Sequence, residues 1–140
     1  MKKILSITAL ALLGAGCTSI QVQPISTQTM PEQICIEENP KVIVADFLSV
    51  VRSRIEYHDI GTQVFENEIP AGCEYTMTYT ALKNWDVTTY LHHAELRLEH
   101  HGRKVGFAQY HLKGKGGLDL TKWKSTKAKM DPVVDELLGK

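Results

Sequence analysis

The chain has 140 residues, of which 16 are Lys or Arg and 16 are Asp or Glu, so its formal net charge is zero. This length suits one domain with a real hydrophobic core, and the balanced charge argues against a nucleic-acid-binding protein. The one long apolar run lies at the N-terminus and is too short to span a bilayer as a helix.

The N-terminal segment has the pattern of a secretory signal. Two lysines precede an apolar run over residues 4–13, and small residues then lead to Cys17. The end of this segment resembles a bacterial lipobox, although Gly14 stands where that signal favours leucine. The resemblance implies that residues 1–16 are removed and that Cys17 carries a diacylglyceryl thioether and an acylated amine. The alternative is an ordinary cleaved signal that leaves Cys17 as a mature residue.

Thr18 occupies the position that sorts bacterial lipoproteins between membranes. By resemblance to those sorting signals, a threonine there implies the outer membrane, with the protein facing the periplasm. Several acyl chains would hold it firmly, whereas one chain binds a bilayer only marginally.

Residues 17–32 follow as the next segment, in which residues 18–31 are polar, uncharged and interrupted by two prolines. This composition predicts a flexible tether with an end-to-end distance of roughly 20–25 Å. The alternative is an added edge strand, because Ile20 and Val22 lie on an apolar pattern.

Cys35 and Cys73 remain as an even pair once Cys17 is acylated. Because the periplasm is oxidising, we interpret the pair as a disulfide, which would stabilise the fold by roughly 3–4 kcal/mol. Two buried thiols are the alternative. A metal or redox role is weaker, since the sequence contains no C-x-x-C motif.

Residues 33–140 form the predicted domain, beginning with a short strand over residues 34–36. Asn39 and Pro40 read as the start of a helix that ends at Gly61. The pattern then predicts strands at residues 63–65, 74–82, 88–99 and 103–112, and a final helix from residue 125. This order favours an α+β two-layer sandwich, with a mostly antiparallel sheet of four to five strands backed by two helices.

The dipeptide His101-Gly102 predicts a hairpin turn. A regular ladder from this turn sets Leu98 opposite Val105 and His92 opposite His111. Two histidines are too few for a good zinc site, and the sequence suggests no third ligand, so we predict no metal.

Several short motifs resemble a family of small lipoproteins of Gram-negative bacteria with no assigned function. The resemblance covers the chain from Cys17 to its end, and its layout is also similar to that of small outer-membrane assembly lipoproteins. The motifs are Cys73-Glu74-Tyr75, Tyr79-Thr80-Ala81, Trp85-Asp86, Gly106-Phe107-Ala108-Gln109-Tyr110, Gly114-Lys115-Gly116-Gly117, Lys122-Trp123 and Val133-Val134-Asp135-Glu136-Leu137-Leu138.

Catalytic motifs are missing from the sequence. It contains neither a G-x-S-x-G nucleophile motif nor the spacing of a phosphate-binding loop. We therefore predict that the protein is not an enzyme and holds no cofactor.

A cluster of lysines lies near Trp123, in and after a glycine-rich loop. It is a candidate surface for anionic lipid or lipopolysaccharide head groups; the alternative is a solvated face with Trp123 in the core. The function we expect is a membrane-anchored, non-catalytic structural or accessory role in the envelope, with another envelope protein as partner. Anionic lipid binding is the alternative function. The candidate anion-binding residues are Lys113, Lys115, Lys122, Lys124 and Lys127.

Overall fold

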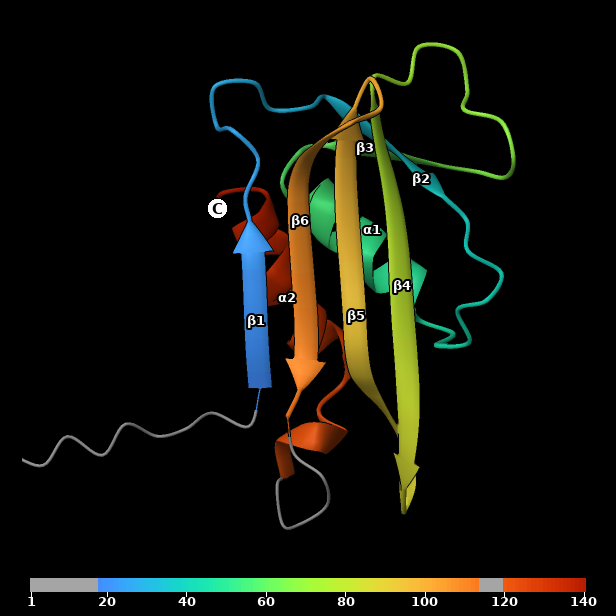
Figure 1. The fold of residues 1–140 in the computed structure, drawn as a ribbon, viewed down its shortest axis with the longest axis vertical. Helices are drawn as coiled ribbons and strands as arrows, with labels where there is room; N and C mark the ends of the chain where they lie inside the picture. Colours follow the sequence, from blue (N-terminus) through green and yellow to red (C-terminus); the bar gives the residue numbers. More distant parts are fainter. Residues whose placement is uncertain (1–17, 114–119) are drawn as a thin grey trace, which may run out of the picture.

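The computed structural model describes residues 18–113 and 120–140 (Figure 1). The expected signal peptide, Cys17 and Lys115 therefore lie outside the described residues. The strands are β1 (Thr18–Gln23), β2 (Gln33–Glu37), β3 (Gly61–Phe65), β4 (Tyr75–Asp86), β5 (Thr88–His100) and β6 (Arg103–Leu112). The helices are α1 (Phe47–Tyr57), the 3₁₀ helix η1 (Leu120–Trp123) and α2 (Thr126–Leu137).

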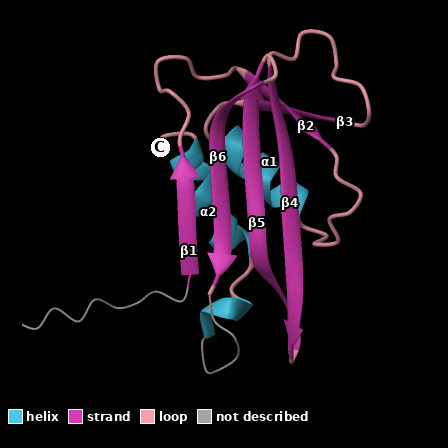
Figure 2. Ribbon diagram, in the orientation of Figure 1, coloured by secondary structure: helices cyan, strands magenta, loops and turns pink. Residues whose placement is uncertain are grey.

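The strands form one mixed sheet in the order β1-β6-β5-β4-β2-β3. Strand β2 runs parallel to β3 and β4, and the other neighbours are antiparallel. Both α-helices cover the same face of this sheet, and the core lies between the two layers (Figure 2). The predicted α+β sandwich is confirmed, with six strands where four to five were expected.

The additional strand comes from the segment that we expected to be a tether. Residues 18–23 pair with β6, from Thr18 opposite Leu112 to Gln23 opposite Phe107. Ile25 then enters the core at 5 % exposure, and its backbone N–H donates to the carbonyl of Leu137 at 2.9 Å. Residues 18–25 therefore belong to the folded domain, which we expected to begin only at residue 33.

Helix α1 begins later than the sequence indicated. The side chain of Asn39 donates to the carbonyl of Tyr79 and accepts from the backbone N–H of Lys41, at 2.9 and 3.1 Å. These bonds hold a turn that ties the chain to β4, so Asn39 does not cap a helix. The helix starts only at Phe47, and Phe47, Val51 and Ile55 form its buried stripe.

A β-bulge changes the expected register between β5 and β6. His100 pairs with Arg103 as predicted, but Leu98 lies opposite Gly106 and not opposite Val105. The shift turns Gly106 toward the core, where a Cβ atom would lie only 2.8 Å from Cγ2 of Ile25. It also places His93, instead of His92, opposite His111.

The disulfide between Cys35 and Cys73 is present, with a Cα–Cα distance of 6.0 Å. It joins β2 to the loop that precedes β4. Helix α2 begins as predicted: the Ser125 hydroxyl accepts from the N–H of Ala128 at 3.1 Å, and Pro132 lies inside the helix.

Charged side chains connect the outer surfaces of the two helices. Nε and Nη2 of Arg54 each donate to Asp135 at 2.6 Å, and His58 Nε2 lies 2.7 Å from the same carboxylate. These contacts, the hydrogen bonds from Arg54 foremost, hold the pKa of Asp135 below its usual value, although burial acts in the opposite direction.

Candidate functional site

The start of β1, the β4–β5 turn and η1 lie at the same end of the molecule (Figure 1). We call this the hairpin end. Its exposed apolar side chains include both tryptophans of the chain, with Trp85 69 % exposed and Trp123 38 % exposed. The further exposed apolar residues of these elements are Ile20, Leu82, Val87 and Leu120.

Val87 forms the tip of the β4–β5 hairpin and is 80 % exposed. Its φ angle is +63°, in the left-handed region that favours glycine and that a β-branched residue adopts only at a cost. A backbone in such a region costs about 1–3 kcal/mol. An exposed apolar side chain at this strained position indicates a role outside the fold itself.

The 3₁₀ helix η1 is bound to the hairpin tip. Lys122 forms an ion pair with Asp86, and the indole N–H of Trp123 donates to the carbonyl of Asp86 at 3.1 Å. The ammonium of Lys122 also lies 4.5 Å from the centre of the Trp123 ring. The tip and η1 therefore act as one structural unit.

The predicted lysine surface is only partly assembled. Lys113 and Lys124 are exposed, and Lys127 is exposed but forms an ion pair with Asp131 one turn along α2. Lys122 is buried at 5 % exposure. Trp123, for which the core was the alternative placement, is partly exposed.

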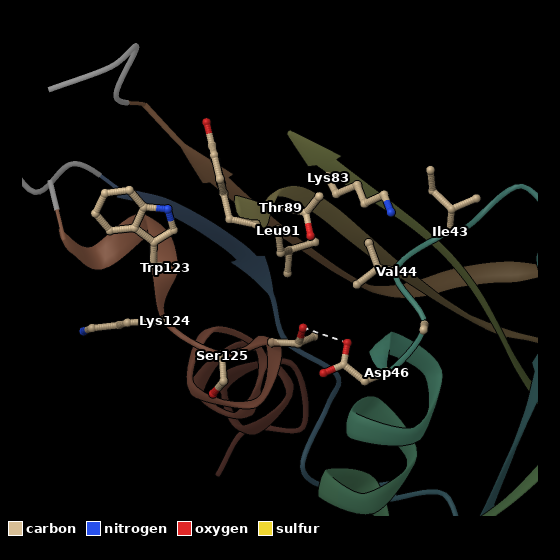
Figure 3. Close-up of a pocket in the computed structure, with 12 residues that line it drawn as sticks. Ile43, Val44, Asp46, Lys83, Thr89, Leu91, Trp123, Lys124 and Ser125 are labelled. Carbon is tan, nitrogen blue, oxygen red and sulfur yellow. Dashed lines mark hydrogen bonds between the residues drawn. The ribbon is translucent and has the colours of Figure 1, made fainter. Parts of the chain in front are cut away.

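An open cavity of about 360 Å³ lies between the β4–β5 hairpin and the starts of both helices. Lys83, Thr89 and Trp123 line its outer part (Figure 3). At its base the Thr126 hydroxyl donates to Asp46 Oδ1 at 2.9 Å, which joins the two helix starts. Its lining mixes apolar side chains with hydroxyl groups and with charges of both signs, Lys83 and Lys124 against Asp46.

The opposite end of the molecule carries the disulfide, the loop that precedes β4 and the β5–β6 turn. We call this the disulfide end. Here Glu74, His100 and His101 each offer one ligand atom, and these atoms all lie within 4.8 Å of one another. The sequence analysis missed this group because Glu74 is distant in sequence and reaches the turn only through the β4–β5 pairing.

A second histidine group lies farther along the sheet. Nδ1 of His93 and Nδ1 of His111 are 3.1 Å apart, and Glu95 approaches the other ring nitrogen of His93 at 3.2 Å. Burial, followed by the nearby His111 and His93, lowers the pKa of His92.

No family model and no curated protein matches the chain. Solved structures do: a PelC dodecamer from Paraburkholderia phytofirmans is 8 % identical with a TM-score of 0.56, over 86 % of this chain and 94 % of that one. A second PelC dodecamer from the same species, a single-residue variant, is 10 % identical with a TM-score of 0.54, over 83 % and 96 % of the two chains. At such low identity these likenesses establish the fold alone.

Neither described α-helix, at 11 and 12 residues, is long enough to cross a bilayer.

Proposed function

We propose that the protein is a lipid-anchored outer-membrane protein with a non-catalytic structural or accessory role in the bacterial envelope. One observation carries the proposal: Thr18, the residue after the expected lipid attachment point, lies at the same end as both exposed tryptophans. The lipobox-like signal and the disulfide, which suits an oxidising compartment, support the same location.

The pairing of β1 leaves little slack between a lipid and the domain. Consecutive Cα atoms are about 3.8 Å apart, so a lipid on Cys17 would hold the start of β1 close to the bilayer. The hairpin tip at Val87 extends beyond the level of Thr18 by about five residues, or roughly 16 Å. The tip also lies about three strand spacings, or roughly 14 Å, to the side. If the domain tilts by about 45° in the plane of the sheet, Thr18 and the hairpin tip at Val87 lie at the same level relative to the bilayer surface.

The chemistry of the hairpin end suits such a plane. Tryptophan side chains prefer the membrane–water interface, because the ring is apolar and the indole N–H is polar. Leu120 and Val87 add apolar surface beside Trp85 and Trp123. Contact with the bilayer would remove these exposed side chains from water.

Anchoring is tested by mass spectrometry of the Cys17 peptide from protein purified out of envelopes. We expect the mass of an acylated N-terminal cysteine, and retention of the protein in the membrane after a high-salt wash. The Cys17→Ser variant is the control and should lose the acyl mass. A wild-type peptide without acyl groups, or release of the protein by salt, would contradict the proposal.

A partner in the envelope is the second part of the proposal. Among the described residues no element covers the sheet face opposite the helices, and Thr78 and Arg97 lie on it as exposed residues. Since the two solved structures described above are dodecamers, we propose that the partner includes further copies of this chain.

Photo-crosslinking in intact cells tests this part. A crosslinker at Arg97 should give a discrete larger species, whereas the same group at Glu136, exposed on α2, serves as the matched control. Monomer alone at both positions would contradict a protein partner. A larger species from Glu136 alone would place the partner on the helical face instead.

Anionic head-group binding is the second candidate function, and the exposed Lys113 and Lys124 favour it. Non-acylated protein (Cys17→Ser) should sediment with anionic vesicles more than with neutral ones, and added salt should reduce the difference. Lys113→Gln with Lys124→Gln should abolish it. Lys127→Gln is the matched control, because Lys127 is already paired with Asp131. Equal sedimentation with both kinds of vesicle would exclude this function.

A further inference from the structure

We infer that Glu74, His100 and His101 form a zinc-binding site at the disulfide end. Their ligand atoms, one from each side chain, all lie within 4.8 Å of one another. This site is separate from the hairpin end, and the inference does not depend on the proposed lipid anchor.

The backbone holds the three residues in place. Glu74 directly follows Cys73, whose disulfide to Cys35 ties this segment to β2. The backbone N–H of His101 donates to the carbonyl of Glu74 at 3.0 Å, so the loop before β4 and the β5–β6 turn are directly connected. Little backbone ordering is then needed when a metal binds.

The side chains differ in their freedom. The ring of His100 is half-buried and stacks on Tyr75 with the ring centres 4.4 Å apart. Glu74 and His101 are exposed, and the rings of His100 and His101 lie 4.4 Å apart. One ligand is therefore positioned by packing, and the other two are free to rotate toward it.

The ligand chemistry matches zinc. Two imidazole nitrogens and one carboxylate oxygen are a set that zinc takes in proteins, with water in the fourth position. Zn–N and Zn–O bonds of about 2.0–2.2 Å require the ligand atoms of a tetrahedral site to approach to roughly 3.4 Å. Rotation of the exposed Glu74 and His101 side chains suffices to close the gap from 4.8 Å. Calcium and magnesium prefer sites made only of oxygen ligands and are disfavoured here.

The other histidine group provides an internal comparison. The carboxylate of Glu95 lies near Nε2 of His93, whereas His111 lies near Nδ1, so the two neighbours approach opposite edges of one ring. They do not converge on a common point, as Glu74, His100 and His101 do. Substitution of His93 therefore separates site-specific binding from the general affinity of surface histidines for zinc.

Zinc alone, titrated into untagged protein in competition with a chromophoric chelator, tests the inference. We expect one zinc ion per chain. Glu74→Gln, His100→Gln and His101→Gln should each weaken zinc binding by about tenfold or more, as loss of metal-site contacts does. The control His93→Gln should leave the affinity unchanged.

Thermal unfolding with and without zinc gives a second readout. Zinc should raise the Tm of the wild type and of His93→Gln, because a ligand that binds only the folded state stabilises it. Measurement in chelator verifies that each variant is folded, which matters for His100 because of its contact with Tyr75. Three results would each overturn the inference: no zinc binding by the wild type, wild-type zinc affinity in the three site variants, or loss of zinc binding in His93→Gln.

Discussion

The two ends of the sheet close their hairpins in different ways. At the disulfide end the β5–β6 turn uses His101 and Gly102, with φ angles of 48° and 77°, so a glycine takes the more extreme angle. At the hairpin end the β4–β5 turn forces Val87 to φ +63°. The disulfide end is thus built from residues that suit its backbone and is covalently cross-linked. The hairpin end keeps an apolar side chain in solvent against backbone preference, which makes this end the stronger candidate for contact with another surface.

Removal of the disulfide should have the largest effect and should separate the two ends. The double variant Cys35→Ser, Cys73→Ser should lose about 3–4 kcal/mol of unfolding free energy in urea, because it frees a loop of 38 residues. Zinc affinity should also fall, since Glu74 follows Cys73, whereas vesicle binding should be unchanged. Equal losses of zinc and vesicle binding would mean that the two ends are not independent.

Gly106→Ala should have the next largest effect. The added Cβ would lie 2.8 Å from Ile25 Cγ2 and 3.0 Å from Leu137 Cδ1, and such overpacking costs about 1–3 kcal/mol. Gly61→Ala is the matched control within a strand, because its nearest neighbour would be 3.5 Å away. Similar urea midpoints for the two variants would show that the segment around Ile25 yields easily and is not fixed in the core.

Loss of the contacts that Asp135 on α2 makes with Arg54 and His58 near α1 should have a smaller effect on stability, and this effect should depend on pH. Asp135→Asn should destabilise the protein at neutral pH by about 1–2 kcal/mol, because it weakens charged hydrogen bonds that are partly exposed. Since folding lowers the pKa of Asp135 below its ordinary 3.8, the stabilisation is present above that value and is lost as pH falls through the folded-state pKa. Wild type and variant should therefore converge in acid. A constant difference down to low pH would contradict this assignment.

Val87→Gly should give the smallest change, in the opposite direction. Glycine adopts the positive φ angle of residue 87 without strain, so the substitution should stabilise the protein by about 1 kcal/mol. The loss of the valine side chain should weaken vesicle binding. Thr89→Gly, in the adjoining strand, should instead destabilise by about 0.5–1 kcal/mol. A Val87→Gly variant that is less stable than wild type would show that the side chain serves the fold.

The sequence was informative where a local pattern determined the structure. The disulfide between Cys35 and Cys73 and the start of the final helix near residue 125 both lie as predicted. Hairpin pairing was correct next to the turn, because His101-Gly102 determines the first pairs.

The errors came from contacts between distant segments. The apolar pattern at Ile20 and Val22 offered an edge strand only as an alternative, and no local pattern reveals that residues 18–23 pair with β6 or that Ile25 packs beside Gly106 and Leu137. Lys122 looked like a surface charge, but its pairing with Asp86 depends on how η1 meets a hairpin tip 36 residues away. Binding sites assembled in this way are difficult to predict from one sequence.

The most direct test of the account is the depth of the hairpin end in a bilayer. Because the chain has two tryptophans, both at this end, Trp85→Phe and Trp123→Phe each leave a single fluorescent reporter. With acylated protein in vesicles, we expect lipids brominated near the head group to quench both reporters more strongly than lipids brominated near the end of the acyl chain. Tryptophans that brominated lipids do not quench, while an aqueous quencher reaches them freely, would contradict the account.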